Sequence, residues 1–488
     1  MIDGLKPYPA MKDSGVPWLG RVPEHWEVRR LGASIDGCIN GVWGDEPNGV
    51  DDLPCVRVAD FDRTRLRVRL KRPTLRAVPA SDRLRRLLKT GDLLLEKSGG
   101  GDLQPVGVVM LYDHPATAVC SNFVARMPVA RGFDPAYLTY LHSYLYAIRL
   151  NVRSIKQTTG IQNLDSSLYL SEAVAFPPHH EQAAIVRFLD HADRRIRRYI
   201  RVKQKLIKLM VEQKQAIIHR AVTRGLDANV RLKPSGVEWL GDVPEHWEVL
   251  TLRRVITRAV DGPHHSPRYL DSGIPFLSAR NIKADRWSLS DAKYISEADY
   301  AEFSKRVVPE LGDVLYTKGG TTGVARAVDL HFRFQVWVHV AVLKVKRNRL
   351  LPEYLALVLN SPRCYEQAQL FTRGATNQDL GLGRMKGIVF ALPPLSEQEE
   401  LLRTIEERTG GLNDAAEKAR REIELLREYR VRLIADVVTG KLDVREAAAR
   451  LPQEAEELEP LDEAEALGEA DDESAADDLD PAPEEAEA

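Results

Sequence analysis

Two proline-rich phrases and one acidic strand come close to motifs that perform chemistry on DNA. FPPH at 176–179 and LPPL at 392–395 resemble the Asn/Asp-Pro-Pro-aromatic motif of amino-methyltransferases, but both begin with an apolar residue. Without an amide or carboxylate at that position, nothing accepts a hydrogen bond from the target amino group. The run GDLLLEK at 91–97 resembles a nuclease acid cluster, yet Glu96 and Lys97 are adjacent and would point to opposite faces of a strand. We therefore predict that this chain has no catalytic residues of its own.

Sequence signatures for bound metals and cofactors are also missing. No GxxxxGK[ST] loop is present, because KSGGG at 97–101 has the wrong order. The pairs His179–His180 and His264–His265 have no set of cysteines or carboxylates at ligand spacing. None of the four cysteines forms a CxxC pair. We predict no metal and no cofactor, and the free thiols, with no signal peptide and no membrane-spanning run, indicate a cytoplasmic protein.

The charge of the chain is divided unevenly along its length. Residues 453–488 contain seventeen Asp or Glu and no Lys or Arg, whereas the whole chain carries a formal charge of −2, so residues 1–452 carry +15. A body this basic suggests a polyanionic partner, and a merely well-solvated surface is the alternative. The Ala-, Glu- and Asp-rich end, taken as 446–488, is predicted to be an acidic disordered tail.

The chain repeats long phrases at an almost constant interval. GVPWLGRVPEHWEVRRL at 15–31 returns as GVEWLGDVPEHWEVLTL at 236–252, and GDLLLEKSGG at 91–100 returns as GDVLYTKGGT at 312–321. AFPPHHEQ, which begins at Ala175, returns as ALPPLSEQ after 216 residues, so the interval drifts by only a few residues from the initial 221. Repetition over this length indicates that the two halves are diverged duplicates.

Each half contains a globular part followed by one long helix. The globular parts mix short apolar runs with Gly, Pro and Asp, which indicates strands, and helices are expected near 137–151 and 352–369. This pattern predicts a mixed α/β (α+β) fold. Residues 180–222 then lack Gly and Pro, and Ser396 with Glu399 forms a capping box at the start of the second long helix.

Apolar side chains recur in both long segments in alternating steps of three and four, which is the pattern of a heptad seam. Gly410–Gly411 is expected to loosen or kink the second helix. The linker from about Thr223 to Ser235 spans at most ~45 Å, less than the ~60 Å of the first helix. The second helix should therefore run back along the first as an antiparallel coiled coil with approximate two-fold symmetry. The predicted seam, for helix pairing or subunit docking, is Ile185, Leu189, Ile196, Leu206, Met210, Ile217, Leu402, Ile405, Ile423, Leu426, Leu433 and Val437.

The chain resembles the specificity subunit of Type I restriction–modification systems over about residues 12–445, because three kinds of phrase recur in the same order: WLG-x-VPEHWEV, G-D-(V/L)-L…K-(S/G)-G and PP-x-x-EQ. The resemblance implies that each globular part is a target recognition domain that reads one half of a bipartite, asymmetric sequence of double-stranded DNA with an unread gap. It also implies that the helices space these domains and dock two modification (methyltransferase) subunits, which restriction–translocase subunits join. S-adenosylmethionine, ATP and Mg would bind those partners and not this chain.

The expected parts follow the repeat. We expect an N-terminal extension at 1–11, target recognition domains at 12–178 and 237–394, spacer helices at 179–222 and 395–440, a linker at 223–236 and the tail at 446–488. Two alternatives stay open: a coiled-coil scaffold that binds only protein, and a self-contained DNA methyltransferase or nuclease. The tryptophans of the repeated phrase should pack where each domain meets the end of the helix pair, namely Trp18, Trp26, Trp239 and Trp247.

Candidate DNA contacts are polar and cationic residues in loops, because Lys, Arg and backbone N–H groups bind phosphates, and Arg, Asn, Gln, Lys and His read base edges. The two lysine loops KSGGGD and KGGTT could equally be tight β-turns. The first half supplies Lys97, Ser98, Gly99, Gln157, Thr158, Thr159, Gln162 and Asn163. The second half supplies His264, His265, Arg268, Arg280, Asn281, Lys318, Gly319, Gly320, Thr321, Thr322, Arg373, Asn377 and Gln378.

Overall fold

The chain folds as two compact units, each a mixed α/β structure that includes parts of two long helices. Unit 1 comprises Met1–Arg198 and Leu426–Ala488, and unit 2 comprises Tyr199–Leu425. The computed structural model describes residues 5–50, 52–101, 103–158, 161–238, 240–374 and 378–452, except for the side chains of residues 157 and 158.

The largest sheet of unit 1 has six strands in the order β4 (Ile39–Asn40), β13 (Val124–Met127), β9 (Asp92–Glu96), β11 (Val109–Tyr112), β7 (Arg67–Val68) and β6 (Phe61–Asp62). Two smaller sheets have the orders β12 (Val119–Cys120), β5 (Asp52–Val56), β8 (Thr74–Ala77) and β10 (Ser98–Gly99), β15 (Ile161–Leu164), β14 (Ile155–Thr158). Two strand pairs are β1 (Met11–Asp13) with β2 (Arg21–Pro23), and β3 (Glu27–Arg30) with β16 (Ala173–Phe176). The short helices are α1 (Ala80–Arg83), α2 (Pro135–Ala147), α3 (Ser166–Leu170) and α10 (Arg445–Ala449).

The largest sheet of unit 2 has the order β20 (Ile256–Asp261), β26 (Val340–Val345), β23 (Val314–Thr317) and β24 (Ala325–Ala327). A second sheet has the order β22 (Lys293–Ile295), β21 (Ile274–Leu277) and β25 (Gln335–Val336). Two strand pairs are β17 (Leu232–Pro234) with β18 (Asp242–Pro244), and β19 (Glu248–Thr251) with β27 (Val389–Leu392). The short helices are α5 (Glu297–Ser304), α6 (Pro352–Leu359), α7 (Pro362–Phe371) and α8 (Leu382–Met385).

The two units share one strand arrangement. The order β4-β13-β9-β11 of unit 1 corresponds to β20-β26-β23-β24 of unit 2, and the parallel pair β5–β12 corresponds to β21–β25. The register of the paired strands agrees too. Val124 lies opposite Glu96 in unit 1, and the residues that correspond to them in the repeat, Val340 and Thr317, lie opposite each other in unit 2. The duplicated sequence is therefore a duplicated topology, and among the described strands unit 1 has in addition β7, β6 and the sheet β10-β15-β14, where unit 2 has isolated bridges.

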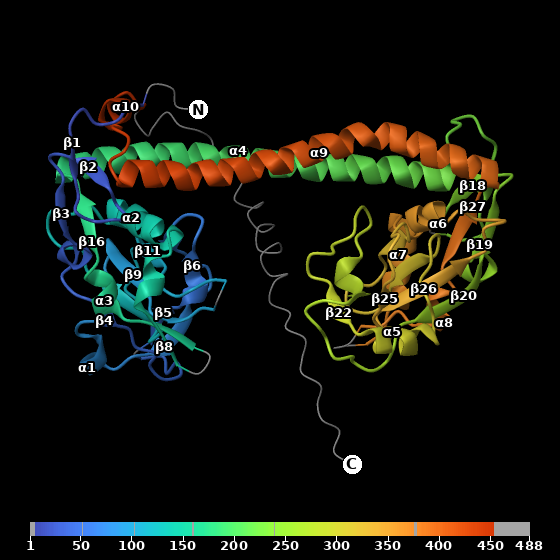
Figure 1. Cartoon of the computed structure of the whole chain (residues 1–488), viewed down its shortest axis with the longest axis horizontal. Helices are drawn as coiled ribbons and strands as arrows, with labels where there is room; N and C mark the ends of the chain where they lie inside the picture. The colour runs from blue at the N-terminus through green and yellow to red at the C-terminus, as the bar shows by residue number, and fades with distance from the viewer. Residues whose placement is uncertain are drawn as a thin grey trace, which may run out of the picture. The chain divides into compact units, whose positions relative to one another are not determined.

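The strand β9 separates two cores in unit 1. Leu93 and Leu95 face the core that contains α2, whereas Leu94 faces the core on the other side of the sheet, as the two-residue period of a strand requires. Asp134 caps α2, because its carboxylate accepts hydrogen bonds from two N–H groups of the first turn. Figure 1 shows α2 covering the sheet beside β9 and β11.

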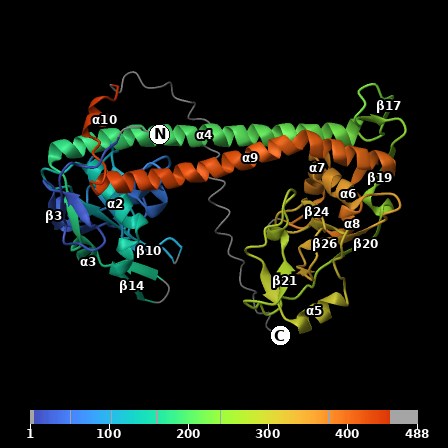
Figure 2. The same ribbon diagram turned by 45° about the horizontal axis from the view of Figure 1, so that its top comes forward.

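The two long helices, α4 (His179–Arg224) and α9 (Leu395–Val438), run in opposite directions and lie side by side in Figures 1 and 2. In unit 1, Arg430 of α9 donates a hydrogen bond to Asp193 of α4. In unit 2, Lys203 pairs with Glu422, and Lys214 donates a hydrogen bond to Asn413 at 2.9 Å. In unit 2 the partner numbers rise along α4 as they fall along α9, so the two helices pair in antiparallel fashion there.

The helix α9 continues through Gly410 and Gly411 as one element. Two glycines inside a helix cost roughly 2 kcal/mol relative to alanine. The hydrogen bond from Lys214 to Asn413 and the burial of Thr409 hold the helix on either side of this pair. Tertiary contacts therefore compensate for the weak local helix propensity.

The buried stripe of α4 departs from the predicted heptad seam in the middle of the helix. Leu206 is 42% exposed, so its assignment to the seam was wrong, and Met210 and Ile217 are half-buried. From Ile196 the shielded positions 200, 203, 207, 210, 214 and 217 keep the alternating steps of four and three of a heptad seam, so the seam runs through Ile207 rather than Leu206. The other seam residues are buried at Ile185, Leu189, Ile196, Ile405, Ile423, Leu433 and Val437, and half-buried at Leu402 and Leu426.

The folded part of the chain ends later than the predicted tail boundary at residue 446. Arg445–Ala449 forms α10, and Ala448 is buried in the core of unit 1. Arg187 of α4 also donates a hydrogen bond to the carbonyl of Leu451 at 2.6 Å. The boundary was therefore wrong, because an alanine-rich turn beside α4 packs although its composition resembles that of the acidic end. Residues 453–488 lie outside the described residues.

The core of unit 1 contains a histidine where unit 2 has a leucine. His142 of α2 is fully buried, its Nδ1 lies 2.8 Å from the hydroxyl of Tyr169, and burial lowers the pKa of His142 to about 3. At the repeat intervals the corresponding residues of unit 2 are Leu359 and Met385, which are both buried. At equivalent positions of the repeat, the core of unit 1 therefore contains a polar pair, His142 and Tyr169, and the core of unit 2 contains two apolar residues.

The double variant His142→Leu/Tyr169→Met is expected to flatten the pH dependence of unfolding below about pH 6.5. Because the folded-state pKa of His142 lies below its unfolded value, its stabilising effect is present above about pH 6.5 and is lost toward about pH 3, by about 1.4 kcal/mol per pH unit. Urea unfolding of the wild type and the double variant at several pH values measures this slope. Equal slopes in the two proteins would contradict the assignment.

Candidate functional site

The first repeated phrase is joined to the start of α4 by a buried carboxylate. Glu181, in the first turn of α4, accepts hydrogen bonds from Nε1 of Trp26 at 3.0 Å and from Nε2 of His25 at 2.8 Å. The hydroxyl of Tyr8 donates to the same carboxylate. A buried carboxylate is stable only when donors replace its water, and a negative charge suits the positive end of a helix. The His-Trp of PEHW therefore binds the Glu of PP-x-x-EQ.

Unit 2 repeats this clamp. Glu397, in the first turn of α9, accepts hydrogen bonds from Nε1 of Trp247 at 3.0 Å and from Nε2 of His246 at 2.8 Å. Each following glutamine adds a second tie: the amide of Gln182 donates to the carbonyl of Pro177 at 2.9 Å, and Gln398 makes the equivalent contact in unit 2. The two phrases that recur in the sequence are thus two halves of one joint.

The same tryptophans meet the end of the other long helix. Gly440 follows α9 with φ of +73°, and a Cβ there would lie 2.3 Å from Pro23 and 3.2 Å from Trp26. Gly225 follows α4 with φ of +72° and lies against Trp247 in the same way. Glycine suits both places because it takes the left-handed conformation that ends a helix and leaves room for the ring.

The expected position of the tryptophans is confirmed for Trp26 and Trp247, which are buried at these joints. Trp18 is half-buried, and Trp239 lies outside the described residues. Sequence reasoning missed Glu181 and Glu397 as the partners of these rings. The available signal was their shared position, three residues after a proline pair in both copies.

The lysine loop of unit 1 is held by neutral partners. Nζ of Lys97 donates to Oδ1 of Asn40 at 2.7 Å, and the hydroxyl of Ser98 donates to Oδ1 of Asn163 at 2.6 Å. Strand β10, Ser98–Gly99, pairs with Gln162 and Asn163 of β15. These predicted contacts therefore lie together, and the loop is one edge of a small sheet rather than an isolated turn.

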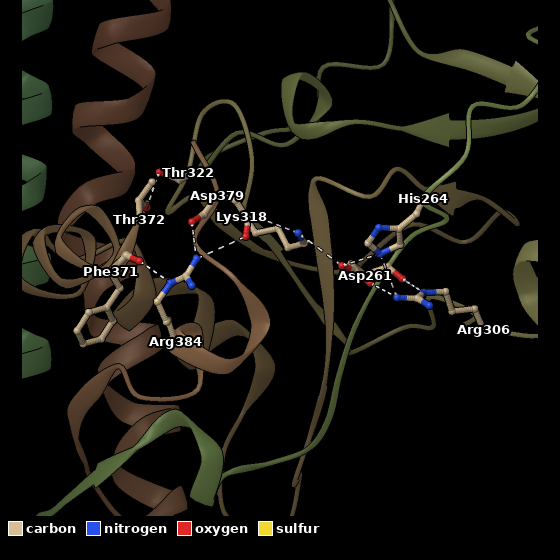
Figure 3. Close-up of polar contacts among 9 residues, drawn as sticks. All are labelled: Asp261, His264, Arg306, Lys318, Thr322, Phe371, Thr372, Asp379 and Arg384. Atoms are coloured by element: carbon tan, nitrogen blue, oxygen red, sulfur yellow. Dashed lines mark hydrogen bonds and ion pairs between the residues drawn. The ribbon is translucent and has the colours of Figure 1, made fainter. Parts of the chain in front are cut away.

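Lys318, the counterpart of Lys97 in unit 2, lies between two carboxylates (Figure 3). Its ammonium is 2.7 Å from Asp379 and 3.5 Å from Asp261, and its side chain is only 8% exposed. Arg384 lies 3.6 Å from Asp379 on the other side. The lysine thus joins the loop after β23 to the segment that precedes α8.

Asp261, at the end of β20, is shared by several cations. Arg306 donates to its carboxylate, and His264 lies 3.4 Å away (Figure 3). Burial acts to raise the pKa of Asp261, but the hydrogen bond from Arg306 and the charges of Lys318, Arg306 and His264 outweigh it and hold the pKa below its usual value. Asp261 therefore stays ionised, and the charge of Lys318 is balanced within the protein instead of facing solvent.

The remaining predicted contacts have separate roles. Asn281 is buried and accepts a hydrogen bond from the N–H of Ser278 at 2.8 Å, and Thr322 is also buried. Gly319 is buried, and a Cβ there would lie 1.9 Å from His339. Thr159 and Asn377 lie outside the described residues, as do the side chains of Gln157 and Thr158. The exposed candidates are His264, His265, Arg268, Arg280, Gly320, Thr321, Arg373 and Gln378.

Fold and sites together define a duplicated mixed α/β chain in which one polar joint anchors each copy to a long helix. Within the described ranges, no group of three or more His, Cys, Asp or Glu side chains could hold a metal ion. In the same ranges, no helix combines the length and the apolar character needed to span a membrane.

Known proteins are similar to this chain in sequence. Residues 244–425 match the family model described as the Type I restriction modification DNA specificity domain. A Methanocaldococcus jannaschii chain assigned to the specificity subunit of the type I restriction enzyme MjaX is 22% identical over 442 residues, which cover 88% of this chain and 96% of that one. The MjaVIII specificity subunit of the same organism is 21% identical, over 62% of this chain and 70% of that one. The comparisons thus relate this chain to type I restriction–modification specificity subunits over most of its length.

A solved structure shares the fold. A chain from work on complex assembly and conformational transition of the type I R-M system superposes with a TM-score of 0.61 at 16% sequence identity. The match covers 86% of this chain and 99% of that chain. The mixed α/β fold with long helices is therefore common to both.

Proposed function

We propose that this chain is the DNA sequence-recognition subunit of a type I restriction–modification complex, in which each unit reads one half of a bipartite, asymmetric target of double-stranded DNA. The observation that carries the proposal is that one shared framework presents two different polar surfaces. The segment that begins with the last residue of β4 is NGVWGDEP at 40–47, and the segment that begins with the last residue of β20 is DGPHHSPR at 261–268. Different hydrogen-bonding groups at one place in a fold select different bases, so the half-sites should differ.

In this proposal α4 and α9 form an antiparallel coiled coil that spaces the two target recognition domains about a pseudo-two-fold axis. A helix of 46 residues is about 69 Å long at about 1.5 Å per residue. That length corresponds to about two turns of duplex DNA at ~34 Å each. The antiparallel contacts within unit 2 support this arrangement, and the stretch of DNA between the half-sites would be the unread gap.

An exposed apolar stripe in the middle of α4 offers a docking face. Tyr199, Val202, Leu206 and Leu209 follow one another in steps of three and four, and each is 42–52% exposed. A row with this spacing is the surface that a partner helix covers. We assign it to the modification (methyltransferase) subunits, because side chains at this spacing provide helix-to-helix packing. The row itself contains no Lys or Arg that could bind a DNA phosphate.

The chain itself is proposed to be non-catalytic, cytoplasmic and free of cofactors. S-adenosylmethionine, ATP and Mg would bind the modification and restriction–translocase partners. A self-contained methyltransferase is disfavoured because the first residues of its two candidate motifs, Phe176 and Leu392, are buried apolar core residues. A scaffold that binds only protein leaves the charge of +15 on residues 1–452 unexplained.

Methylome sequencing tests the proposal in a host from which the gene has been deleted. Deletion should abolish methylation at one gapped, asymmetric motif, and the wild-type gene should restore it. The variant Leu206→Asp/Leu209→Asp should not restore it, because charges on the stripe oppose helix docking. The matched control is Leu425→Asp, at an exposed leucine of α9 outside the stripe, which should restore the motif. A methylome unchanged by deletion would contradict the recognition role, and full rescue by the stripe variant would contradict only the docking face.

A further inference from the structure

The edge of the large sheet in unit 1 carries a hairpin that the described strands of unit 2 do not repeat. Strands β6 and β7 pair in antiparallel fashion, and β7 lies parallel to β11. The corresponding sheet of unit 2 ends at β24, and at this place the bridge Ile282–Trp287 closes a shorter hairpin, with the N–H of Lys283 donating to the carbonyl of Arg286 at 3.1 Å. The two copies therefore differ in the length of this hairpin and in its pairing with the large sheet, which β7 makes in unit 1.

The hairpin and the residues after it are strongly basic on one face. RTRLRVRLKR at 63–72 contains six Lys or Arg and no acidic residue. Val68 is buried, and Leu66 and Leu70 pack against the same core. Because side chains alternate along an extended chain, Arg67 and Arg69 point away from that core. The apolar residues thus fix a row of cations at the surface.

The turn of the hairpin is held in one conformation. Asp62 accepts hydrogen bonds from the N–H groups of Thr64 at 3.1 Å and Arg65 at 2.9 Å. Arg430 of α9 donates to the carbonyl of Thr64 at 2.8 Å. Leu66 has φ of 57°, a left-handed conformation that is uncommon for a residue with a side chain. Such backbone strain persists only where the surroundings enforce it, and it gathers at functional sites.

Three cations of this segment have no counter-charge. Arg69, Lys71 and Arg72 are exposed, and within the described ranges their side chains have no ion-pair or hydrogen-bond partner. The other three cations are neutralised by carboxylates, in the pairs Arg63–Glu96, Arg65–Asp62 and Arg67–Asp113. The corresponding segments of the two units are 57–74, which contains seven Lys or Arg and two Asp, and 278–293, which contains four Lys or Arg and two Asp.

We propose that Arg69, Lys71 and Arg72 form a phosphate-binding surface of unit 1 that contacts the DNA backbone without reading bases, and that unit 2 has no equivalent. The inference rests on the proposed function, since it assumes that unit 1 binds duplex DNA. Each cation that neutralises a phosphate releases a counterion and adds sequence-independent affinity. This segment of unit 1 therefore adds a sequence-independent contribution to DNA affinity that the corresponding segment of unit 2 does not supply.

The test uses the full chain with its modification subunits and a duplex of random sequence. The variant Arg69→Gln/Lys71→Gln/Arg72→Gln should make the slope of log affinity against log salt shallower by about 2.7, and should weaken binding on the order of 100-fold at about 0.15 M salt. Affinity for the methylated target should fall by the same factor, because phosphate contacts carry no sequence information. The matched control is Lys283→Gln/Arg286→Gln/Lys293→Gln, which removes three exposed cations of unit 2 and should change the slope by less than one unit.

The possible outcomes separate the two proposals. If the wild-type complex does not bind duplex DNA at all, the proposed function itself fails. If the wild type binds and the unit 1 variant, with an unchanged melting temperature, keeps the wild-type slope and affinity, only the phosphate surface is overturned. Equal losses in the unit 1 and unit 2 variants overturn the asymmetry between the units. A loss confined to the methylated target would identify base contacts and also overturn the inference.

Discussion

Glu181→Ala is expected to lower the free energy of unfolding of unit 1 by about 3–5 kcal/mol. The Glu181 side chain is fully buried and accepts hydrogen bonds from Tyr8, His25 and Trp26. Without the carboxylate, the indole N–H of Trp26 and the hydroxyl of Tyr8 are left buried without an acceptor, and each such group costs about 1–3 kcal/mol. Urea unfolding measures the loss of stability, and hydrogen exchange of backbone amides shows which of the two units is destabilised.

Glu397→Ala is the matched control in the second copy. The side chain of Glu397 is 25% exposed and holds His246 and Trp247 without a tyrosine. Water can therefore replace part of what is lost, and we expect a cost of about 1–2 kcal/mol, confined to unit 2. The methylated motif should be the same for both variants at a permissive temperature. Equal losses of stability, or a changed motif, would show that the joint does something other than anchor the helix.

Lys318→Met is expected to lower the stability of unit 2 by about 2–4 kcal/mol at neutral pH, because it leaves Asp261 and Asp379 without their shared cation. Lys97→Met in unit 1 removes only a hydrogen bond to neutral Asn40 and should cost less than about 1 kcal/mol. Urea unfolding of both variants measures the difference. If Lys318→Met instead kept wild-type stability while DNA affinity fell, Lys318 would be a phosphate contact and not an internal tie.

The same variant should also change the response of unit 2 to acid. The pKa of Asp261 lies below its ordinary value in the folded protein. Its stabilising effect is therefore present above the unfolded pKa, about 3.9, and is lost as the pH falls through the lower folded-state pKa. Lys318 is one of the charges that lower this pKa, so Lys318→Met should lose less stability than the wild type between neutral pH and pH values below about 4. A steeper loss in the variant would contradict this assignment.

Local sequence patterns identified the repeat, the two long helices and the junction tryptophans, because each is encoded by neighbouring residues. The role of Lys318 could not be predicted in this way. Its partners Asp261 and Asp379 are each about sixty residues away along the chain, and a lysine in a glycine-rich loop has the same sequence whether it meets phosphate or carboxylate. Leu206 was misplaced for a different reason. The predicted and observed seams share positions 203, 210 and 217, but Leu206 and Ile207 are both apolar, and the seam position between 203 and 210 falls on Ile207.

The basic hairpin was also missed, because a search for recognition loops favours Gly, Asn and Gln. RTRLRVRLKR at 63–72 has the alternation of a surface strand with one charged face, which is visible in the sequence. The unpaired state of Arg69 and Lys71 is not visible there. It depends on which carboxylates the fold places nearby, and Asp62 and Glu96 form ion pairs with other arginines, Arg65 and Arg63.

The division of the chain into units has a consequence for its folding during synthesis on the ribosome. Unit 1 needs Leu433, Ile434 and Val437 of α9 for its core, but these residues are synthesised only after all of Tyr199–Leu425. Domains fold largely as they emerge, from the N-terminus onward. The second-encoded unit can therefore finish folding first, while the first-encoded unit waits with one side of its core uncovered until the last turns of α9 arrive.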